Sequence, residues 1–201
     1  MIKVDNFSYL DIINKCNVTF EKGIYYLRGK NGAGKSTFLD CLSGLNTKYE
    51  GTISGNESIL YLNQNLYFDN RLKSKDFVVF VLRICGINDG MNFYLNFISK
   101  YKWGNELEKL MDKRVGILSG GERAKLFFST LCCADKEWYL FDEPFSGVDE
   151  DGIADMKDII LELYDNGKGV ILTSHEKMPL EGVPLTAIYK ISNGTIIEDN
   201  S

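Results

Sequence analysis

The sequence predicts an α/β fold with a mainly parallel sheet, an antiparallel β-subdomain and an inserted helical lobe. Short apolar strand patterns alternate with helical patterns through most of the 201 residues, which is typical of parallel sheets with crossover helices. Residues 66–117 instead carry aromatic and aliphatic side chains at helical spacing. We therefore expect residues 1–65 and 118–201 to form the core and residues 66–117 to form a helical subdomain.

The first part of the core is expected to hold five strands and one helix. The helix should cover Lys35–Leu45, because a glycine-rich loop precedes it and Gly44 and nearby turn residues end it. The strands show period-two alternation or short apolar runs: Ile2–Phe7, Cys16–Phe20, Ile24–Leu27, Thr52–Ser54 and Ile59–Leu62.

The second part of the core is expected to continue the alternation and to close with a hairpin. Asn193-Gly194 is a strong two-residue turn signal between two apolar runs. The expected elements are a helix at Gly120–Ala134, a strand at Trp138–Phe141, a helix at Gly152–Asn166, a strand at Gly169–Thr173, and strands at Ala187–Ile191 and Thr195–Glu198.

The charge and apolar content of the chain exclude some functions. A net charge of −5 argues against a nucleic-acid partner, which usually requires a basic excess. No run of 18 apolar residues is present, so no span of a bilayer is predicted. The first residues lack an apolar signal core, and the five cysteines are read as buried thiols. We expect a cytoplasmic protein.

A phosphate-binding loop lies between the third predicted strand and the helix that follows. Its sequence satisfies GxxxxGK[ST] in the required place, which predicts a P-loop NTPase core that binds ATP and Mg²⁺. Glycines let successive amides point at phosphates, Lys35 should bridge the β- and γ-phosphates, and Ser36 should bind Mg²⁺. The residues expected to bind the nucleotide here are Gly29, Asn31, Gly32, Ala33, Gly34, Lys35, Ser36 and Thr37.

Two carboxylates and a histidine follow apolar strands that should end at the same edge of the sheet. Asp142 can hold Mg²⁺, and Glu143 can polarise the attacking water as a general base. His175 is the single histidine of the chain, and from this edge it could reach the γ-phosphate and Glu143. A neutral imidazole there could donate to the phosphate as charge develops.

With these motifs, the chain resembles the ATP-binding subunit of ATP-binding-cassette (ABC) transporters over essentially its whole length. The family's glutamine loop matches Gln64, which the resemblance places beside the Mg²⁺ and the attacking water. The signature motif matches LSGGE at Leu118–Glu122, and the aspartate loop matches SGVD, which ends at Asp149. With the phosphate loop, Asp142–Glu143 and His175, six motifs occur in the family's order.

The resemblance implies that two chains pair head to tail around two ATP molecules. Ser119, Gly120 and Gly121 begin a helix and so offer an anion-binding surface, which in the family faces the γ-phosphate of the opposite subunit, with Glu122 and Asp149 nearby. The signature ends in Glu122, where glutamine is commonest in the family. The carboxylate of Glu122 could still accept a hydrogen bond from the ribose. Gly147-Val148 replace the usual alanine-leucine, which could alter communication between the sites.

The resemblance also implies an aromatic ring that stacks on adenine and a separate membrane subunit. Tyr9 is the preferred ring and Phe7 the competing one. The expected partners are an integral membrane permease, reached through the helical lobe, and a second ATP-binding subunit, identical or related. The protein should then lie on the inner face of the cell membrane. Two alternatives stay open: a soluble ABC ATPase not coupled to transport, and a nucleotide sensor without turnover.

Overall fold

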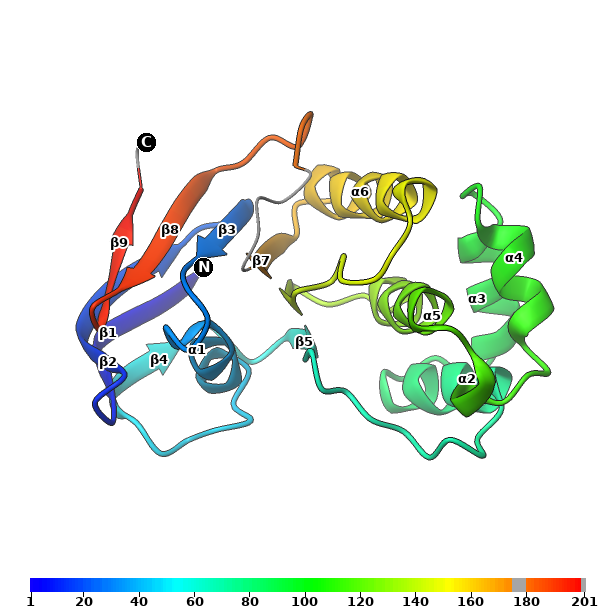
Figure 1. Ribbon diagram of the computed structural model, residues 1–201, viewed down its shortest axis with the longest axis horizontal. Coiled ribbons are helices and arrows are strands. Elements are labelled where there is room, and N and C mark those ends of the chain that lie inside the picture. Colours follow the sequence, from blue (N-terminus) through cyan, green and yellow to red (C-terminus); the bar gives the residue numbers. More distant parts are fainter. Residues whose placement is uncertain (175–179, 200–201) are drawn as a thin grey trace. The chain divides into compact units, whose positions relative to one another are not determined.

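The computed structural model describes residues 1–174 and 180–199, and it divides into two compact units (Figure 1). Unit 1 consists of Met1–Gln64, Lys136–Pro144 and the chain from Glu162 onward, and unit 2 consists of Asn65–Asp135 and Phe145–Leu161. In the described part of the chain, no helix is long and apolar enough to cross a membrane.

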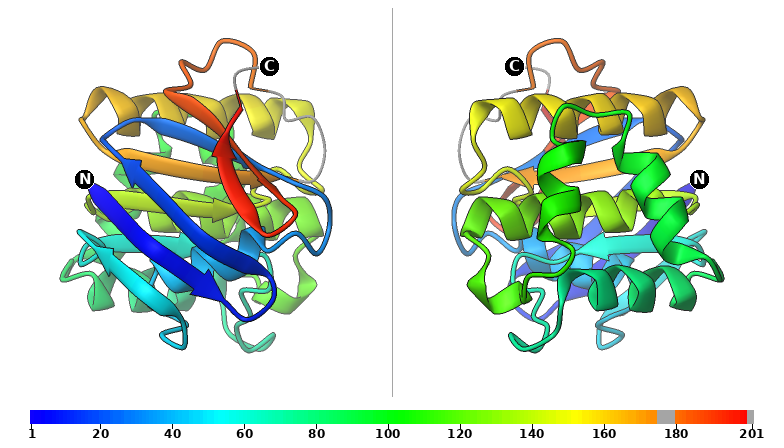
Figure 2. Two further views of the ribbon diagram at one scale, coloured as in Figure 1. Left: turned by 90° about the vertical axis from the view of Figure 1, so that its left-hand side faces the viewer. Right: turned by 90° about the vertical axis from the view of Figure 1, so that its right-hand side faces the viewer.

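Unit 1 contains a three-stranded antiparallel sheet in the order β2-β1-β4. Its strands are β1 (Ile2–Tyr9), β2 (Ile13–Phe20) and β4 (Glu50–Ser54). In Figure 2 (left), β1 and β2 (blue) run alongside β4 (cyan). This sheet is the predicted antiparallel β-subdomain.

The other strands described for unit 1 form a six-stranded sheet. Its order is β5-β6-β7-β3-β8-β9; β8 and β9 pair antiparallel, and all the other neighbours pair parallel. The mainly parallel sheet predicted from the sequence is therefore confirmed. The strands are β3 (Ile24–Arg28), β5 (Ile59–Leu62), β6 (Trp138–Asp142), β7 (Gly169–Ser174), β8 (Ala187–Ser192) and β9 (Thr195–Glu198).

The helix α1 (Lys35–Leu42) packs into the core of unit 1, which side chains of both sheets share. Phe38 of α1 is fully buried and meets Phe7 of β1 and Phe20 of β2 at ring distances of 5.5 and 6.4 Å. Aromatic pairs at such distances add packing energy to the apolar area that they bury. This packing fixes α1, and with it the loop that precedes α1.

The strand β6, next to the edge strand β5, carries an unusually large side chain, Trp138, which the neighbouring strand β7 accommodates with a glycine. Gly169 of β7 lies directly opposite Trp138 in the parallel register. A Cβ atom on Gly169 would lie 2.3 Å from the indole ring, so only glycine leaves room for it. Lys22 covers the ring, with its Nζ 5.0 Å from the centroid.

Unit 2 is built from helices. They are α2 (Ser74–Ile84), α3 (Gly90–Ile98), α4 (Gly104–Leu110), the short 3₁₀ helix η1 (Val115–Ile117), α5 (Gly120–Cys133) and the part of α6 (Glu150–Asp165) up to Leu161. The hydroxyl groups of Tyr94 in α3 and Ser129 in α5 are 2.8 Å apart, and the Trp103 amide donates to Asp155 of α6 at 2.8 Å.

Unit 2 is larger than the helical subdomain expected at residues 66–117. The additional helix α5 joins it because Phe127 packs against Phe68 and Phe77, with ring distances of 5.8 and 4.5 Å. The sequence pattern alone gave no sign of these contacts between distant segments. As a result, the signature segment Leu118–Glu122 and Asp149 belong to unit 2, whereas the phosphate loop belongs to unit 1.

Candidate functional site

The loop between β3 and α1 has the backbone of an anion-binding loop. Gly32 and Gly34 adopt positive φ angles of 77° and 102°, which glycine adopts without a steric penalty. A Cβ atom on Gly34 would lie 2.7 Å from Cγ2 of Ile12, and one on Gly29 would lie 2.8 Å from the Ile191 carbonyl oxygen. Both glycines are therefore required by close packing around the loop.

Lys35, the first residue of α1, extends back over this loop. Its Nζ donates to the carbonyl oxygens of Gly29 at 2.8 Å and Lys30 at 3.4 Å, and the residue is only 6% exposed. The helix N-terminus adds a partial positive charge at the same place. The ammonium group of Lys35 and the start of α1 thus meet at one small loop.

A cavity of about 480 Å³ opens beside the loop, within the range of small-molecule sites. Its described lining brings together eight predicted site residues and Ile12: Ile12, Asn31, Gly32, Gly34, Lys35, Ser36, Thr37, Gln64 and Glu143. Gly29 and Ala33 belong to the same loop without being part of that lining.

Two predicted site residues, Gln64 and Glu143, are joined by a hydrogen bond at this cavity. The amide Nε2 of Gln64 donates to Oε2 of Glu143 at 3.0 Å. Glu143 adopts a positive φ of 53°, a left-handed conformation that costs a non-glycine residue of the order of 1–3 kcal/mol. Its amide donates to the backbone and side-chain oxygens of Thr173, both at 3.2 Å. The strained turn fixes the position of this carboxylate.

A small polar network supports the turn before Gln64. Asn63 donates through Nδ2 to the Tyr61 hydroxyl at 3.0 Å and to Asp40 of α1 at 3.1 Å. Burial, followed by the nearby charges of Asp142 and Asp40, raises the pKa of Tyr61, so its hydroxyl stays protonated. The network ties the glutamine loop to the helix that follows the phosphate loop.

Asp142 ends β6 and has one oxygen available for a further ligand. The residue is 2% exposed; the Thr173 hydroxyl donates to its Oδ1, whereas its buried Oδ2 has no hydrogen-bond partner. A buried carboxylate oxygen without a partner is costly, so a cation fits here. Among the described residues no cluster of three or more His, Cys, Asp or Glu side chains could hold a metal, whereas Mg²⁺ typically uses one or two carboxylates with phosphate oxygens and water.

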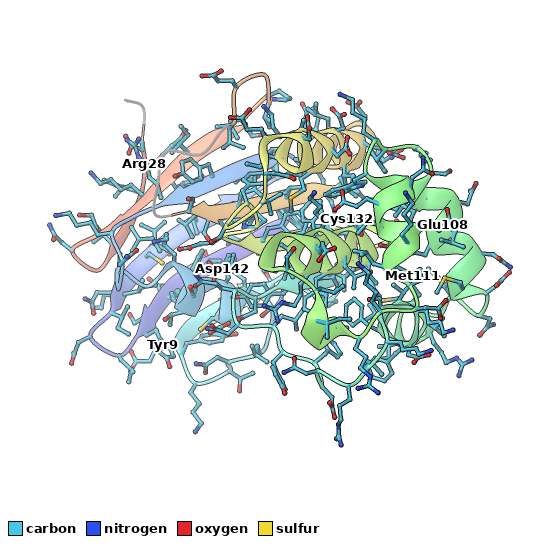
Figure 3. All side chains as sticks on the ribbon, turned by 45° about the vertical axis from the view of Figure 1, so that its right-hand side comes forward. Tyr9, Arg28, Glu108, Met111, Cys132 and Asp142 are labelled. Carbon is cyan, nitrogen blue, oxygen red and sulfur yellow. The ribbon has the colours of Figure 1, made fainter. Side chains whose placement is uncertain are left out.

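The two rings considered for adenine stacking lie in different environments. Phe7 is fully buried and packs against Phe38 and Tyr49, so its faces are occupied. Tyr9, at the end of β1 (labelled in Figure 3), is partly buried, and its hydroxyl accepts from Asn46 at 2.9 Å. Tyr9 is not part of the described lining of the cavity, which Ile12 reaches instead. His175 lies outside the described residues.

The signature segment begins α5 with a complete capping box. Ser119 is the N-cap: its Oγ accepts from the Glu122 amide at 3.1 Å, and Oε2 of Glu122 accepts from the Ser119 amide at 2.7 Å. Mainly because of this backbone hydrogen bond, the pKa of Glu122 lies below its ordinary value. Ser119 and Gly120 are exposed. The capping box defines the helix start and leaves its outer surface open.

Asp149, the last predicted site residue of unit 2, caps the start of α6. Its Oδ1 accepts from the Gly152 amide at 3.0 Å, and its side chain is 67% exposed. The loop that contains Asp149 approaches the signature helix closely, because a Cβ atom on Gly121 would lie 3.0 Å from the Gly147 carbonyl oxygen. The aspartate loop and the signature segment are therefore neighbours within unit 2.

Residues that the sequence pattern did not single out also shape the site. Ile12 lines the cavity and packs on Gly34, but a single apolar residue near a strand end carries no recognisable signal. Thr173 supports both Asp142 and Glu143. Its place at the end of an apolar strand, beside the strand of the two carboxylates, could have indicated this role.

The phosphate loop, the unpartnered oxygen of Asp142 and the strained Glu143, all on a mainly parallel sheet, define a P-loop nucleotide-binding protein. A model of the ABC transporter family matches residues 13–146. The chain belongs to this family and is an ABC-type ATPase.

Similar proteins include several ATP-binding proteins of transporters. An uncharacterized ABC transporter ATP-binding protein of Methanocaldococcus jannaschii is 34% identical over 81% of this chain, which spans 61% of that relative's length. An energy-coupling factor transporter ATP-binding protein of Thermotoga maritima is 31% identical over 92% of this chain and 74% of its own length. A cytochrome c biogenesis ATP-binding export protein of Reclinomonas americana is 26% identical over 85% of this chain and 81% of its own length.

Solved structures confirm the fold. The ATP-binding subunit of an ABC transporter matches with a TM-score of 0.85 at 19% identity, over 98% of this chain and 89% of that one. A putative metal-chelate type ABC transporter in an inward-facing conformation matches with a TM-score of 0.81 at 19% identity, over 98% of this chain and 82% of that one.

Proposed function

We propose that this chain binds ATP with Mg²⁺ in the cavity of unit 1, hydrolyses it in a pair of chains, and powers a membrane permease. The observation that carries the proposal is the convergence, at one cavity, of the phosphate loop with the hydrogen-bonded pair of Gln64 and Glu143. A loop that grips phosphate next to a fixed carboxylate can both hold the nucleotide and direct water at its γ-phosphate.

The phosphate loop carries the binding step. Its amides and the start of α1 receive the phosphate oxygens, and Lys35 neutralises the β- and γ-phosphates from a position already held by two carbonyl groups. Preorganised donors of this kind cost no rearrangement when charge develops. The adenine ring is assigned to Tyr9, because the faces of Phe7 are already covered.

Ser36, Asp142 and Gln64 are the residues that would hold Mg²⁺. The buried Oδ2 of Asp142 that lacks a partner is the best support for this assignment. When bound, the ion supplies positive charge that neutralises the phosphate oxygens. The Thr173 hydroxyl keeps the Asp142 carboxylate oriented.

Replacing Asp142 with asparagine is expected to remove the effect of Mg²⁺ on ATP binding. Asparagine keeps the shape and one oxygen that can accept from Thr173, but it lacks the negative charge. Isothermal titration of ATP with and without Mg²⁺ should show tighter binding with the ion for the wild type, and equal affinities for Asp142→Asn. Asp5→Asn, which loses only an exposed ion pair with Lys3, should behave as wild type. A persistent Mg²⁺ effect in Asp142→Asn would refute the assignment.

Hydrolysis is assigned to Glu143 as the general base, assisted by Gln64 and His175. Gln64 already donates to Glu143 at 3.0 Å, so it can report the state of the γ-phosphate region to the rest of the chain. His175 is assigned from the sequence alone as the donor that meets the γ-phosphate. A base must lie within hydrogen-bond reach of the water that it activates.

The second half of each site is assigned to the partner chain. Ser119, Gly120, Gly121 and Glu122 begin α5 with an exposed surface, where a helix N-terminus favours an anion. Asp149 stands next to this surface in unit 2. In a symmetric pair, each chain would contribute this surface to the ATP bound by the other, and loss of the γ-phosphate would release the pair.

The binding site for the permease is assigned to the exposed apolar side chains of unit 2. Tyr67, Phe80, Ile84 and Phe93 are 74, 53, 70 and 48% exposed, and such exposed apolar side chains often mark protein interfaces. Names of similar proteins, among them the export protein and the energy-coupling factor transporter protein, favour a transport role. The chain would then work on the cytoplasmic side of the membrane.

Purification of the tagged chain from detergent-solubilised membranes tests this role. A multi-spanning membrane protein should accompany the wild type and be lost with Phe80→Asp, whereas Ile197→Asp, a change at an exposed apolar residue of unit 1, should retain it. A phosphate-release assay on the wild type tests turnover. Partners that are soluble only would favour the alternative ABC ATPase, and absent phosphate release would favour a nucleotide sensor.

A further inference from the structure

A buried lysine connects the signature helix to the aspartate loop of unit 2. Lys125 lies in α5, six residues after Ser119, and it is 4% exposed. Its Nζ is 3.0 Å from Oδ1 and 3.3 Å from Oδ2 of Asp149, and 3.4 Å from Oε2 of Glu106 in α4. One ammonium group therefore joins three separate segments of unit 2.

The charge of Lys125 depends on these two carboxylates. Burial lowers the pKa of Lys125, but the hydrogen bond and charge of Asp149 and the charge of Glu106 outweigh burial, so the pKa lies above its ordinary value. The hydrogen bond from Lys125 is in turn the main cause of the lowered pKa of Asp149. A buried charge that loses its partner is strongly unfavourable, which favours this contact in the folded chain.

The packing around the ion pair leaves room for nothing larger than a hydrogen atom at position 152. A Cβ atom on Gly152 would lie 2.5 Å from Cε of Lys125 and 2.6 Å from Oδ1 of Asp149. The loop also meets the start of α5 at Gly121 and Gly147. Two contacts, one between backbones and one between charged side chains, thus hold the loop to the signature helix.

The exposure of Asp149 indicates that this contact serves more than stability. Its side chain is 67% exposed, whereas that of Lys125 is 5% exposed. A contact that only stabilised the interior would gain little from a carboxylate that faces solvent on its other side. Lys125 instead approaches Asp149 from within and leaves its outer side free to meet another molecule.

We propose that Lys125 is a positioning residue that holds Asp149 in register with the signature segment Leu118–Glu122, so that both meet the partner chain as one rigid surface. This inference rests on the proposed function, because the surface acts on the ATP bound by the partner. It assigns Lys125 no contact with the nucleotide: Lys125 acts through Asp149.

The first test compares two substitutions of Lys125 in the full chain. Lys125→Met should lower kcat for ATP by about 10-fold or more, because small misplacements of a reacting site cost up to about 100-fold. KM and ATP affinity should stay within about twofold, because the phosphate loop is unchanged. Lys125→Arg should restore most of kcat. Lys75→Met, which loses an exposed ion pair with Asp112, is the matched control.

The second test asks whether Lys125 acts through Asp149. Asp149→Asn retains the cap of α6, because asparagine caps helices as well as aspartate, but it loses the ion pair. If Lys125 acts through Asp149, the double variant Lys125→Met/Asp149→Asn should be no slower than Asp149→Asn alone. If the losses of kcat in the two single variants multiply in the double variant, the proposal is contradicted. It is also contradicted if Lys125→Met and Lys125→Arg lower the melting temperature without changing kcat, because that pattern is purely structural.

Gly152→Ala keeps the proposal testable if Lys125→Met does not fold. The added methyl group displaces Lys125 and Asp149 without removing a charge, and it should also lower kcat with KM unchanged; wild-type kcat would overturn the proposal. A change at Ser119 separates this result from the proposed function. If Ser119→Asp abolishes turnover while the changes at Lys125 and Gly152 do not, only the inference about Lys125 fails. If Ser119→Asp also keeps full turnover, the paired site itself is wrong.

Discussion

Replacing Glu143 with glutamine is expected to lower ATP turnover by about 10²- to 10⁴-fold, the usual contribution of a positioned general base. Glutamine has nearly the same size and cannot accept the proton of the attacking water. ATP affinity should stay near wild type, because Lys35 and the loop that bind the phosphates are unchanged. Single-turnover hydrolysis together with equilibrium ATP binding separates the two effects.

The Glu143→Gln substitution should leave the hydrogen bonds around position 143 largely intact. The amide of a glutamine at position 143 can still pair with Gln64, and the backbone bonds to Thr173 are independent of the side chain. Glu150→Gln, at an exposed position in the first turn of α6, is the matched control and should hydrolyse ATP normally. Normal turnover in Glu143→Gln itself would mean that another group activates the water.

Replacing Ser119 with aspartate is expected to lower turnover by about 10²-fold or more, since interactions with developing phosphate charge are of this size. Aspartate is as good an N-cap as serine, so α5 should still fold. Its negative charge, however, would face the γ-phosphate that the partner chain presents. ATP binding by the isolated chain should be unaffected, because Ser119 lies in unit 2 and the cavity lies in unit 1.

Ser119→Asn is the control for this change, because asparagine caps the helix without adding charge. It should retain most of the turnover. If Ser119→Asp and Ser119→Asn are equally slow, the hydroxyl is required and the charge has no effect. If Ser119→Asp weakens ATP binding in the isolated chain, the signature segment acts on its own nucleotide and the assignment to the partner fails.

Mixtures of inactive chains test the contribution of the partner directly. A pair of one Ser119→Asp chain and one Glu143→Gln chain contains a site with an intact base from the first and an intact signature from the second. With Glu143→Gln in large excess, the activity per Ser119→Asp chain should approach that of wild type mixed with the same excess of Glu143→Gln. Wild type mixed with the same excess of a chain carrying both changes should stay far below that reference, because nearly all its pairs lack a complete site. Activity no higher in the first mixture than in the last would contradict a shared site.

The fold was largely predictable because its local signals agree with each other. A phosphate loop of this type lies between a strand and a helix. Here the loop follows β3 (Ile24–Arg28) and precedes α1 (Lys35–Leu42), as predicted. The helix ends three residues before the expected Leu45. Its C-cap is Ser43, whose amide bonds back to Leu39, and this local bond is not visible in the apolar pattern.

The arrangement of unit 2 was less predictable, because long-range packing determines it. The apolar pattern identified a helical lobe, but the contact of Phe127 with Phe77 that joins α5 to it links segments 50 residues apart. Lys125 was not singled out for the same reason: a lysine in a helix is usually exposed. Only its partners in α4 and before α6 show that it is buried and paired.

The oligomeric state of Glu143→Gln with ATP and Mg²⁺, measured by size-exclusion chromatography with light scattering, tests the central claim most directly. We expect a dimer that forms with ATP and Mg²⁺, persists because hydrolysis is blocked, and is absent with ADP or when Ser119→Asp is added to the same chain. Monomers at high protein concentration with saturating ATP and Mg²⁺ would contradict the account.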